Sequence, residues 1–214
     1  MSSQEKTEQV KNPEPDQKVA TAADDCGVVT GPDGIVRCAW AGSDAEYVRY
    51  HDEEWGAINR DDRALFEKLC LEGFQAGLSW ITILRRRPAF RSAFHDFDVE
   101  RVAAMTETDV AALMENTGII RNRSKIEATI GNARTTLSLD RSLSDLLWSF
   151  APDAGARARP TRRSEIPAIT AESTALSKDL RKRGFRFVGP TTMYALMQAT
   201  GMVDDHFADC WRAG

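Results

Sequence analysis

The stretch LSKDLRKRGFRFVGPTTMYALMQATG, residues 176–201, decides the fold because it predicts two helices joined by a tight turn. Gly184 stands just past the end of the first helix, a position where glycine is common. Pro190 suits the first turn of the second helix, since its missing N–H would have no intrahelical partner there. The apolar residues Phe185, Phe187 and Val188 are expected to pack under the turn. The stretch therefore predicts a helical hairpin.

The same hairpin carries features that suit an anion. Lys182 and Arg183 on its first helix supply positive charge. Gly189 leaves room for another backbone to approach closely, and the free amides at a helix N-terminus can bind a phosphate. Together with the turn at Gly184, these features are typical of a helix-hairpin-helix, which grips DNA without reading its sequence. A plain pair of antiparallel helices remains the alternative from this local pattern.

The rest of the chain also predicts helices. Asp61 or Asp62 can cap a helix that runs to Phe74, and Ser79 can cap a short helix that Pro88 is expected to stop. Further helical patterns cover residues 106–116, 122–138, 141–149 and 170–183, and residues 151–169 predict a long loop. No run of alternating apolar and polar residues predicts a strand. We therefore expect an all-α globular domain.

The N-terminal segment and the overall composition limit the classes of protein to which the chain can belong. Residues 1–35 have almost no periodic apolar positions, so we expect a disordered tail followed by one helical domain over residues 36–214. Hydrophobic residues make up 42% of the 214, which is enough for a core. No run of about 18 apolar residues predicts a membrane span, and the polar N-terminus does not resemble a secretory signal. An intracellular, cytoplasmic protein is expected by default.

The net charge of −4 is unevenly distributed. The tail holds three lysines and seven acidic residues, so the remaining chain is neutral overall. Within it, basic residues gather at residues 85–87, 121–125, 157–163 and 178–186. A neutral domain with local basic patches can hold a phosphate backbone, although each patch alone is also compatible with a solvated helix face.

Two widely separated Cys/His pairs predict a metal site. His206 and Cys210 stand one helical turn apart, and Cys38 and His51 form the other candidate pair. Two Cys and two His make a closed tetrahedral set, which is typical of structural zinc. Such a site would join the two ends of the domain and would leave no open position for catalysis. The alternative is that each is a lone buried cysteine or a surface histidine.

Two segments carry more aromatic and polar side chains than a core needs. The first, residues 37–56, contributes Trp40, Tyr47, Tyr50 and Trp55, and the second, residues 69–80, contributes Glu72, Gln75 and Trp80. Burying a carboxylate is costly unless it meets a partner, and aromatic rings near a carboxylate suit a flat or cationic ligand. A packed aromatic core with Glu72 at its rim is the alternative.

Five segments of the chain resemble, in order, the signature blocks of the DNA-3-methyladenine glycosylase I family. They read CAW…YVRYHDEEWG, LCLEGFQAGLSWITIL, GIIRNRSKIEATIGNA, LSKDLRKRGFRFVG and MQATGMVDDHFADC, and they extend from about Arg37 to Cys210. The resemblance implies an all-helical member of the helix-hairpin-helix glycosylases with a structural zinc. The family's ligands map onto Cys38, His51, His206 and Cys210.

The resemblance also implies an activity, the hydrolysis of the N-glycosidic bond of 3-methyladenine in double-stranded DNA by a monomer, at the nucleoid. Trp40, Tyr47 and Trp80 would bind the base. Glu72 and Tyr50 would be catalytic, with Glu72 accepting hydrogen bonds from the adenine edge. Gly184, Gly189, Lys182 and Arg183 would contact the DNA backbone.

Two details after the hairpin bear on mechanism. The run PTTMYALM lacks the lysine that related bifunctional enzymes use as a nucleophile, which predicts no strand cleavage. Related enzymes of the superfamily carry a catalytic Asp after the hairpin, which the 3-methyladenine family generally lacks, often with Asn there, whereas this chain has Asp204. It either stabilises positive charge on the deoxyribose or orients the neighbouring His206.

Two other classes of protein remain as rivals. One is a zinc-stabilised DNA-binding module without catalysis, and the other is a helical protein-interaction domain. The aromatic residues around Glu72 argue against the first, because a module that only binds DNA needs no base pocket. The basic hairpin argues against the second.

Overall fold

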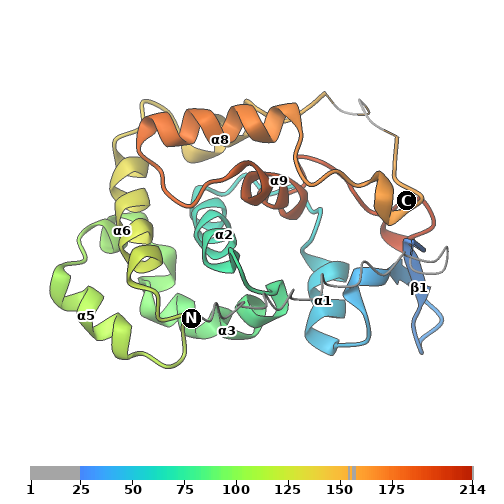
Figure 1. Ribbon diagram of the computed structural model, residues 1–214, viewed down its shortest axis with the longest axis horizontal. Coiled ribbons are helices and arrows are strands. Elements are labelled where there is room, and N and C mark those ends of the chain that lie inside the picture. Colours follow the sequence, from blue (N-terminus) through green and yellow to red (C-terminus); the bar gives the residue numbers. More distant parts are fainter. Residues whose placement is uncertain (1–24, 154, 156–157, 214) are drawn as a thin grey trace, which may run out of the picture.

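The computed structural model describes residues 25–153, 155 and 158–213, and most of this chain is helical (Figure 1). The helices are α1 Ala45–Glu53, α2 Asp62–Gln75, α3 Trp80–Ala93, α4 Val99–Ala103, α5 Glu107–Glu115, α6 Arg123–Leu137, α7 Leu143–Trp148, α8 Ala171–Arg183 and α9 Pro190–Ala199. The short 3-10 helices are η1 Ala39–Ala41, η2 His95–Phe97, η3 Arg163–Glu165 and η4 Trp211–Ala213. None of the described helices is long and apolar enough to cross a membrane.

Helix α2 lies at the centre of the helical body, where α3, α6, α7 and α9 pack against it (Figure 1). It begins as predicted, because the Asp61 side chain accepts a hydrogen bond from the backbone N–H of Ala64. Every residue from Leu69 to Phe74 is buried, so α2 is enclosed on all sides near its end. This enclosure explains why a carboxylate on α2, that of Glu72, lies inside the protein.

The predicted helical hairpin consists of α8, the turn 184–189 and α9. Gly184 adopts a φ of 106°, a left-handed conformation that costs a glycine little, and Pro190 occupies the first turn of α9. Phe185 and Val188 are buried under the turn, and the Ser177 hydroxyl donates to the carbonyl of Val188 at 2.6 Å. The prediction for residues 176–201 is confirmed.

Helix α3 does not stop at Pro88 as predicted but continues to Ala93. A proline inside a helix removes one backbone hydrogen bond and crowds the preceding turn. Phe90, two residues beyond it, is fully buried with its ring centroid 4.6 Å from that of Phe74. The burial of this aromatic pair offsets the missing hydrogen bond, and it depends on contacts between helices that the local sequence does not reveal.

The all-α expectation needs one correction, a small antiparallel hairpin of β1 Val28–Thr30 and β2 Val36–Cys38. Strands of three residues are too short to show alternation, which is why the pattern predicted none. Residues 25–35 are ordered, so the domain begins earlier than the expected boundary at residue 36. Residues 1–24 of the predicted tail lie outside the described residues.

Candidate active site

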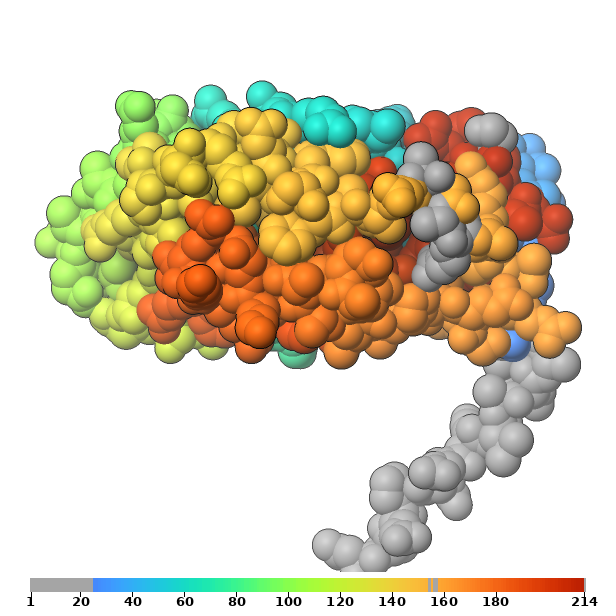
Figure 2. Space-filling view, turned by 90° about the horizontal axis from the view of Figure 1, so that it is seen from above, coloured from blue at the N-terminus to red at the C-terminus, as the bar shows by residue number. Residues whose placement is uncertain are grey.

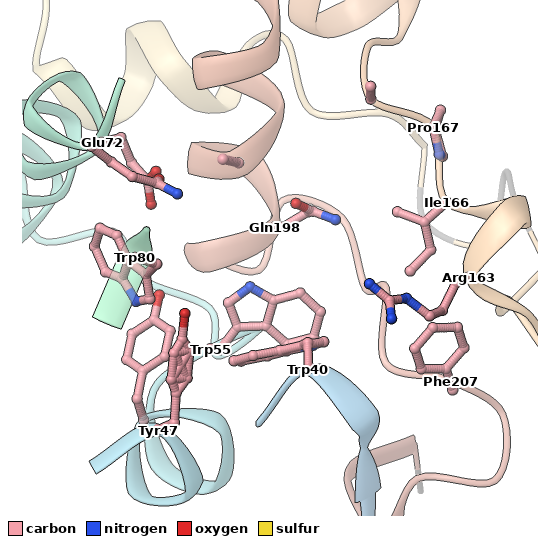
Figure 3. Close-up of a pocket in the computed structure, with 14 residues that line it drawn as sticks. Trp40, Tyr47, Trp55, Glu72, Trp80, Arg163, Ile166, Pro167, Gln198 and Phe207 are labelled. Atoms are coloured by element: carbon pink, nitrogen blue, oxygen red, sulfur yellow. The ribbon is translucent and has the colours of Figure 1, made fainter. Parts of the chain in front are cut away.

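A cavity of about 410 Å³ opens between α1, α2, the start of α3 and α9 (Figure 3). Its walls contain every side chain that the sequence assigned to a base pocket: Trp40, Tyr47, Tyr50, Glu72 and Trp80. Trp55 and Gln75, which come from the same two segments, also line it. Segments 37–56 and 69–80 therefore meet in one concave site, as a binding pocket requires.

The aromatic wall is built by α1 and the residues at its two ends. Asp44 caps α1 by accepting hydrogen bonds from the N–H groups of Glu46 and Tyr47. Tyr47 and Tyr50 then face the same side of α1, and the Trp40 ring packs edge-on against both, at centroid distances of 5.6 and 6.3 Å. The Tyr47 hydroxyl oxygen accepts from the N–H of Ile81 at 3.2 Å, which connects this wall to α3.

Glu72 projects from α2 toward the cavity from the end where Trp80 and Tyr47 lie (Figure 3). The residue is only 4% exposed, and within the described part of the chain its carboxylate accepts no hydrogen bond. Burial raises the pKa of Glu72 to about 7, and the positive charge of Lys68 opposes that rise. A buried, perturbed carboxyl group in an aromatic cavity marks a functional site.

The opposite wall of the cavity was not expected from the sequence. It comes from residues 163–168, which the pattern assigned to a long loop, and includes Arg163, Ile166 and Pro167 (Figure 3). Gln198 of α9 and Phe207 complete it. The basic cluster at 157–163 was the one sequence signal near this wall, and it did not indicate a position beside Glu72.

A contact between Asp25, near the N-terminal end of the described chain, and Ser164 holds this wall in position. The carboxylate of Asp25 accepts hydrogen bonds from the N–H and the hydroxyl of Ser164, each at 2.9 Å, and the N–H of Arg163 donates to the Asp25 carbonyl. Figure 2 shows the orange atoms of this segment beside the blue atoms of the N-terminal hairpin at one end of the molecule. Residues that the sequence assigned to a disordered tail thus hold one side of the pocket.

A cluster of potential metal ligands lies behind the aromatic wall. The ligand atoms of Cys38, His51 and Cys210 lie within 4.8 Å of one another, and all three residues are buried. Burial lowers the pKa of His51, so its ring is in the neutral form that a metal binds. The structure therefore brings together three of the four predicted ligands from opposite ends of the domain.

His206 lies beside this cluster, with its ring centroid 5.2 Å from that of His51. Its Nε2 atom is buried and has no hydrogen-bond partner among the described residues. Its Nδ1 atom lies 2.9 Å from Asp204, just as His51 Nδ1 lies 2.8 Å from Asp52. Each histidine thus has one nitrogen held by a carboxylate and the other turned inward, an arrangement typical of metal-ligating histidines.

Asp204 makes its contacts away from the cavity. One carboxylate oxygen of Asp204 accepts a hydrogen bond from the backbone N–H of His206 and also lies 2.9 Å from the ring nitrogen Nδ1 of that residue. The other oxygen forms an ion pair with Arg159 at 2.7 Å. The next acid, Asp205, is buried and accepts hydrogen bonds from Tyr194 and from the pocket residue Gln198. This geometry favours the reading in which Asp204 orients His206 over the one in which it faces a deoxyribose.

The basic residues of the helical hairpin differ in their exposure to solvent. Lys182 is exposed, whereas Arg183 is half-buried and forms an ion pair with Asp179 at 2.7 Å. Gly189 precedes α9, and a Cβ there would lie 3.5 Å from the guanidinium of Arg181. The guanidinium of Arg181, which the sequence did not single out, therefore lies near the N-terminus of α9.

Comparison with known proteins identifies close relatives. The sequence model of the methyladenine glycosylase family matches residues 40–213. DNA-3-methyladenine glycosylase 1 of Escherichia coli K12 is 50% identical over 177 residues, which cover 81% of this chain and 95% of that protein. A crystal structure of 3-methyladenine DNA glycosylase I superposes with a TM-score of 0.79 at 50% identity, covering 82% of this chain and 98% of the other. A variant of such an enzyme in complex with 3-methyladenine has the same TM-score at 37% identity, covering 83% and 97%.

Proposed function

Because the chain belongs to the methyladenine glycosylase family, we propose that it hydrolyses the N-glycosidic bond of 3-methyladenine in DNA and leaves an abasic site. The observation that carries this proposal is the cavity in which aromatic rings surround the buried carboxylate of Glu72. A protein that only binds DNA has no need of such a cavity. The substrate would be double-stranded DNA, bound by a monomer at the nucleoid.

The reaction requires the damaged base to leave the helical stack, because the glycosidic bond is inaccessible within a duplex. Methylation at N3 weakens pairing and gives the base a positive charge. When the bond from C1′ breaks, its electron pair moves to the base, which departs neutral; a water oxygen then bonds to C1′ and the water releases a proton to solvent, which leaves a hydroxyl on C1′. A cationic base is already a good leaving group, so the pocket need supply little acid catalysis.

The pocket residues then have separate roles. Trp40, Tyr47 and Trp80 enclose the flat base by stacking and shape, and cationic rings are attracted to aromatic faces. Glu72 accepts a hydrogen bond from the exocyclic amine of adenine, while Tyr50 contacts the base from α1. Guanine presents the oxygen O6 at that edge, and a carboxylate repels it. The carboxylate would therefore select adenine.

We also propose that Cys38, His51, His206 and Cys210 hold a zinc ion. Two thiols and two imidazoles are the donor set that zinc prefers, and the buried Nε2 of His206 lacks another partner among the described residues. A closed set of four ligands gives the ion a structural role. It would join β2 and α1 to the C-terminal segment and would support Tyr50, the neighbour of His51.

The wild-type protein is expected to release free 3-methyladenine from methylated duplex DNA and to leave the DNA strands intact. The run 190–197 contains no lysine that could attack the sugar. Chromatography of the released bases measures the first outcome, and a denaturing gel without added base or heat measures the second. DNA binding without base release would support the non-catalytic module instead, and a nicked strand would refute the monofunctional assignment.

Replacement of Asp204 by Asn is expected to weaken zinc binding about 10- to 100-fold, because Asp204 orients His206. The kcat of the zinc-saturated variant should stay within about 2-fold of wild type, since Asp204 does not line the cavity. Competition with a chelator measures zinc affinity, and single-turnover assays measure the rate. A large fall in rate with full zinc occupancy would instead assign Asp204 to the deoxyribose.

A further inference from the structure

A lysine lies directly behind the aromatic wall of the pocket. Lys68 is one helical turn before Glu72 on α2, and its ammonium donates a hydrogen bond to the Tyr50 hydroxyl oxygen at 3.2 Å. The same nitrogen lies 4.6 Å from the centre of the Tyr50 ring and 5.1 Å from that of Trp80. Both rings line the cavity, whereas Lys68 does not. The amine is therefore covered by the wall and is not placed to attack a sugar.

The charged groups around Lys68 are already paired with other residues. Just past the end of α1, Glu54 forms a two-point ion pair with Arg87 of α3, with one contact of 2.7 Å. On α2 itself, Glu67 binds Arg91 at 2.9 Å. From α9, the side chains that reach the pocket are those of Ala195 and Gln198, which carry no charge.

These pairings leave Lys68 and Glu72 as complementary charges in the same buried space. In the described part of the chain neither forms a direct ion pair, with each other or with a third residue, and the Lys68 ammonium donates to the Tyr50 oxygen. Residues four apart on a helix lie on the same face, so Lys68 and Glu72 share one face of α2, close enough for their charges to act on each other without a direct ion pair. A buried carboxylate without hydrogen-bond donors needs such a neighbour to remain charged.

We propose that Lys68 is a positioning residue for base excision, because its ammonium keeps Glu72 in the carboxylate form. By donating a hydrogen bond to the Tyr50 oxygen, the same ammonium also makes the hydroxyl hydrogen of Tyr50 point away from Lys68. This inference rests on the proposed excision of 3-methyladenine. The carboxylate form matters because only it both accepts strongly from an exocyclic amine and repels the O6 of guanine. A protonated Glu72 could instead donate to O6, and the distinction between the two purines would weaken.

The electrostatics of the pair agree with this role. Burial raises the pKa of Glu72, and Lys68 is the group that lowers it again. Burial lowers the pKa of Lys68, and Glu72 is the largest influence that raises it. Each charge therefore stabilises the other in a site that disfavours both.

The test is the pH dependence of kcat/KM for 3-methyladenine release. For wild type the rate should rise as the pH increases through about 7, because the carboxylate form of Glu72 predominates above its pKa. In Lys68→Met, loss of the ammonium should move this midpoint upward by about one pH unit or more, so that activity at pH 7 falls about 5-fold or more and recovers at higher pH. Lys68→Arg should retain the wild-type midpoint.

Two further variants separate charge from structure. Lys68→Gln keeps a donor for Tyr50 but removes the charge, so its midpoint should move as in Lys68→Met. Lys125→Met removes another lysine, whose ammonium donates to the carbonyls of Phe74 and Ala76 and forms no ion pair with any residue that the structure describes. Its melting temperature should fall while its midpoint stays at the wild-type value.

Base selectivity provides a second readout. At pH 7, Lys68→Met and Lys68→Gln should release more 3-methylguanine relative to 3-methyladenine than wild type, whereas Lys125→Met should not. The inference is wrong if both neutral Lys68 variants keep the wild-type midpoint and base ratio and change only in stability. Failure of the wild-type protein to release 3-methyladenine would refute the proposed function itself, which is a separate result.

Discussion

Glu72→Gln should reduce kcat/KM for 3-methyladenine release about 10- to 100-fold while the protein stays folded. Glutamine has the same shape, so the cavity is preserved, but the charge that strengthens the hydrogen bond to the adenine amine is lost. A hydrogen bond to a charged group contributes about 1.5–3 kcal/mol, and each 1.4 kcal/mol corresponds to a factor of ten. The rate should also lose its dependence on pH near 7, because the titrating group is gone.

Single-turnover release of 3-methyladenine from methylated duplex DNA measures this effect. Glu115→Gln is the matched control, since Glu115 is exposed on α5 and does not line the cavity. A thermal melt of both variants shows whether folding is intact. If Glu72→Gln releases 3-methyladenine at the wild-type rate at pH 7, the carboxylate of Glu72 has no role in the reaction, even though it lies in the cavity.

Cys210→Ser is expected to lose stoichiometric zinc and to lower the melting temperature by about 8–16 °C. Zinc binding supplies ~10–16 kcal/mol of folding free energy in small zinc domains. A loss of only about 4 kcal/mol corresponds to this temperature range in a chain of roughly this length. The C-terminal segment would then be free to separate from β2 and α1, and the support behind Tyr50 would weaken.

Elemental analysis of the purified protein and a thermal melt with and without a chelator measure this prediction. Cys26→Ser is the control, because Cys26 is exposed and lies outside the Cys/His cluster. It should keep its zinc and its melting temperature. The zinc assignment fails if the metal-free wild type melts at the same temperature as protein supplied with zinc.

The secondary structure was predictable where local chemistry decides it. Gly184 and Pro190 bound the hairpin turn, and Asp61 caps α2, because these preferences depend on the residue and its immediate neighbours. Pro88 misled the prediction, since the burial of Phe90 against Phe74 outweighs a local penalty. The β1–β2 hairpin was too short to leave a periodic signal.

Half of the pocket was predictable and half was not. Trp40, Tyr47, Tyr50, Glu72 and Trp80 stand in two segments whose aromatic and acidic content is unusual in itself. Lys68 gave no such signal, because a lysine one turn before a glutamate is common on solvated helices. Its role depends on the rings of Tyr50 and Trp80, which come from two other helices.

The sequence by itself determined the helical hairpin, the aromatic residues around Glu72 and the Cys and His residues that pair across the chain. Each depends on residue type and spacing, which a sequence states directly. Only the tertiary structure decided the outer wall, where Asp25 binds Ser164, 139 residues further along the chain, and so holds Arg163 beside the cavity. Contacts over such separations form when distant surfaces are buried together, and the free energy of that burial belongs to the assembled fold rather than to either segment.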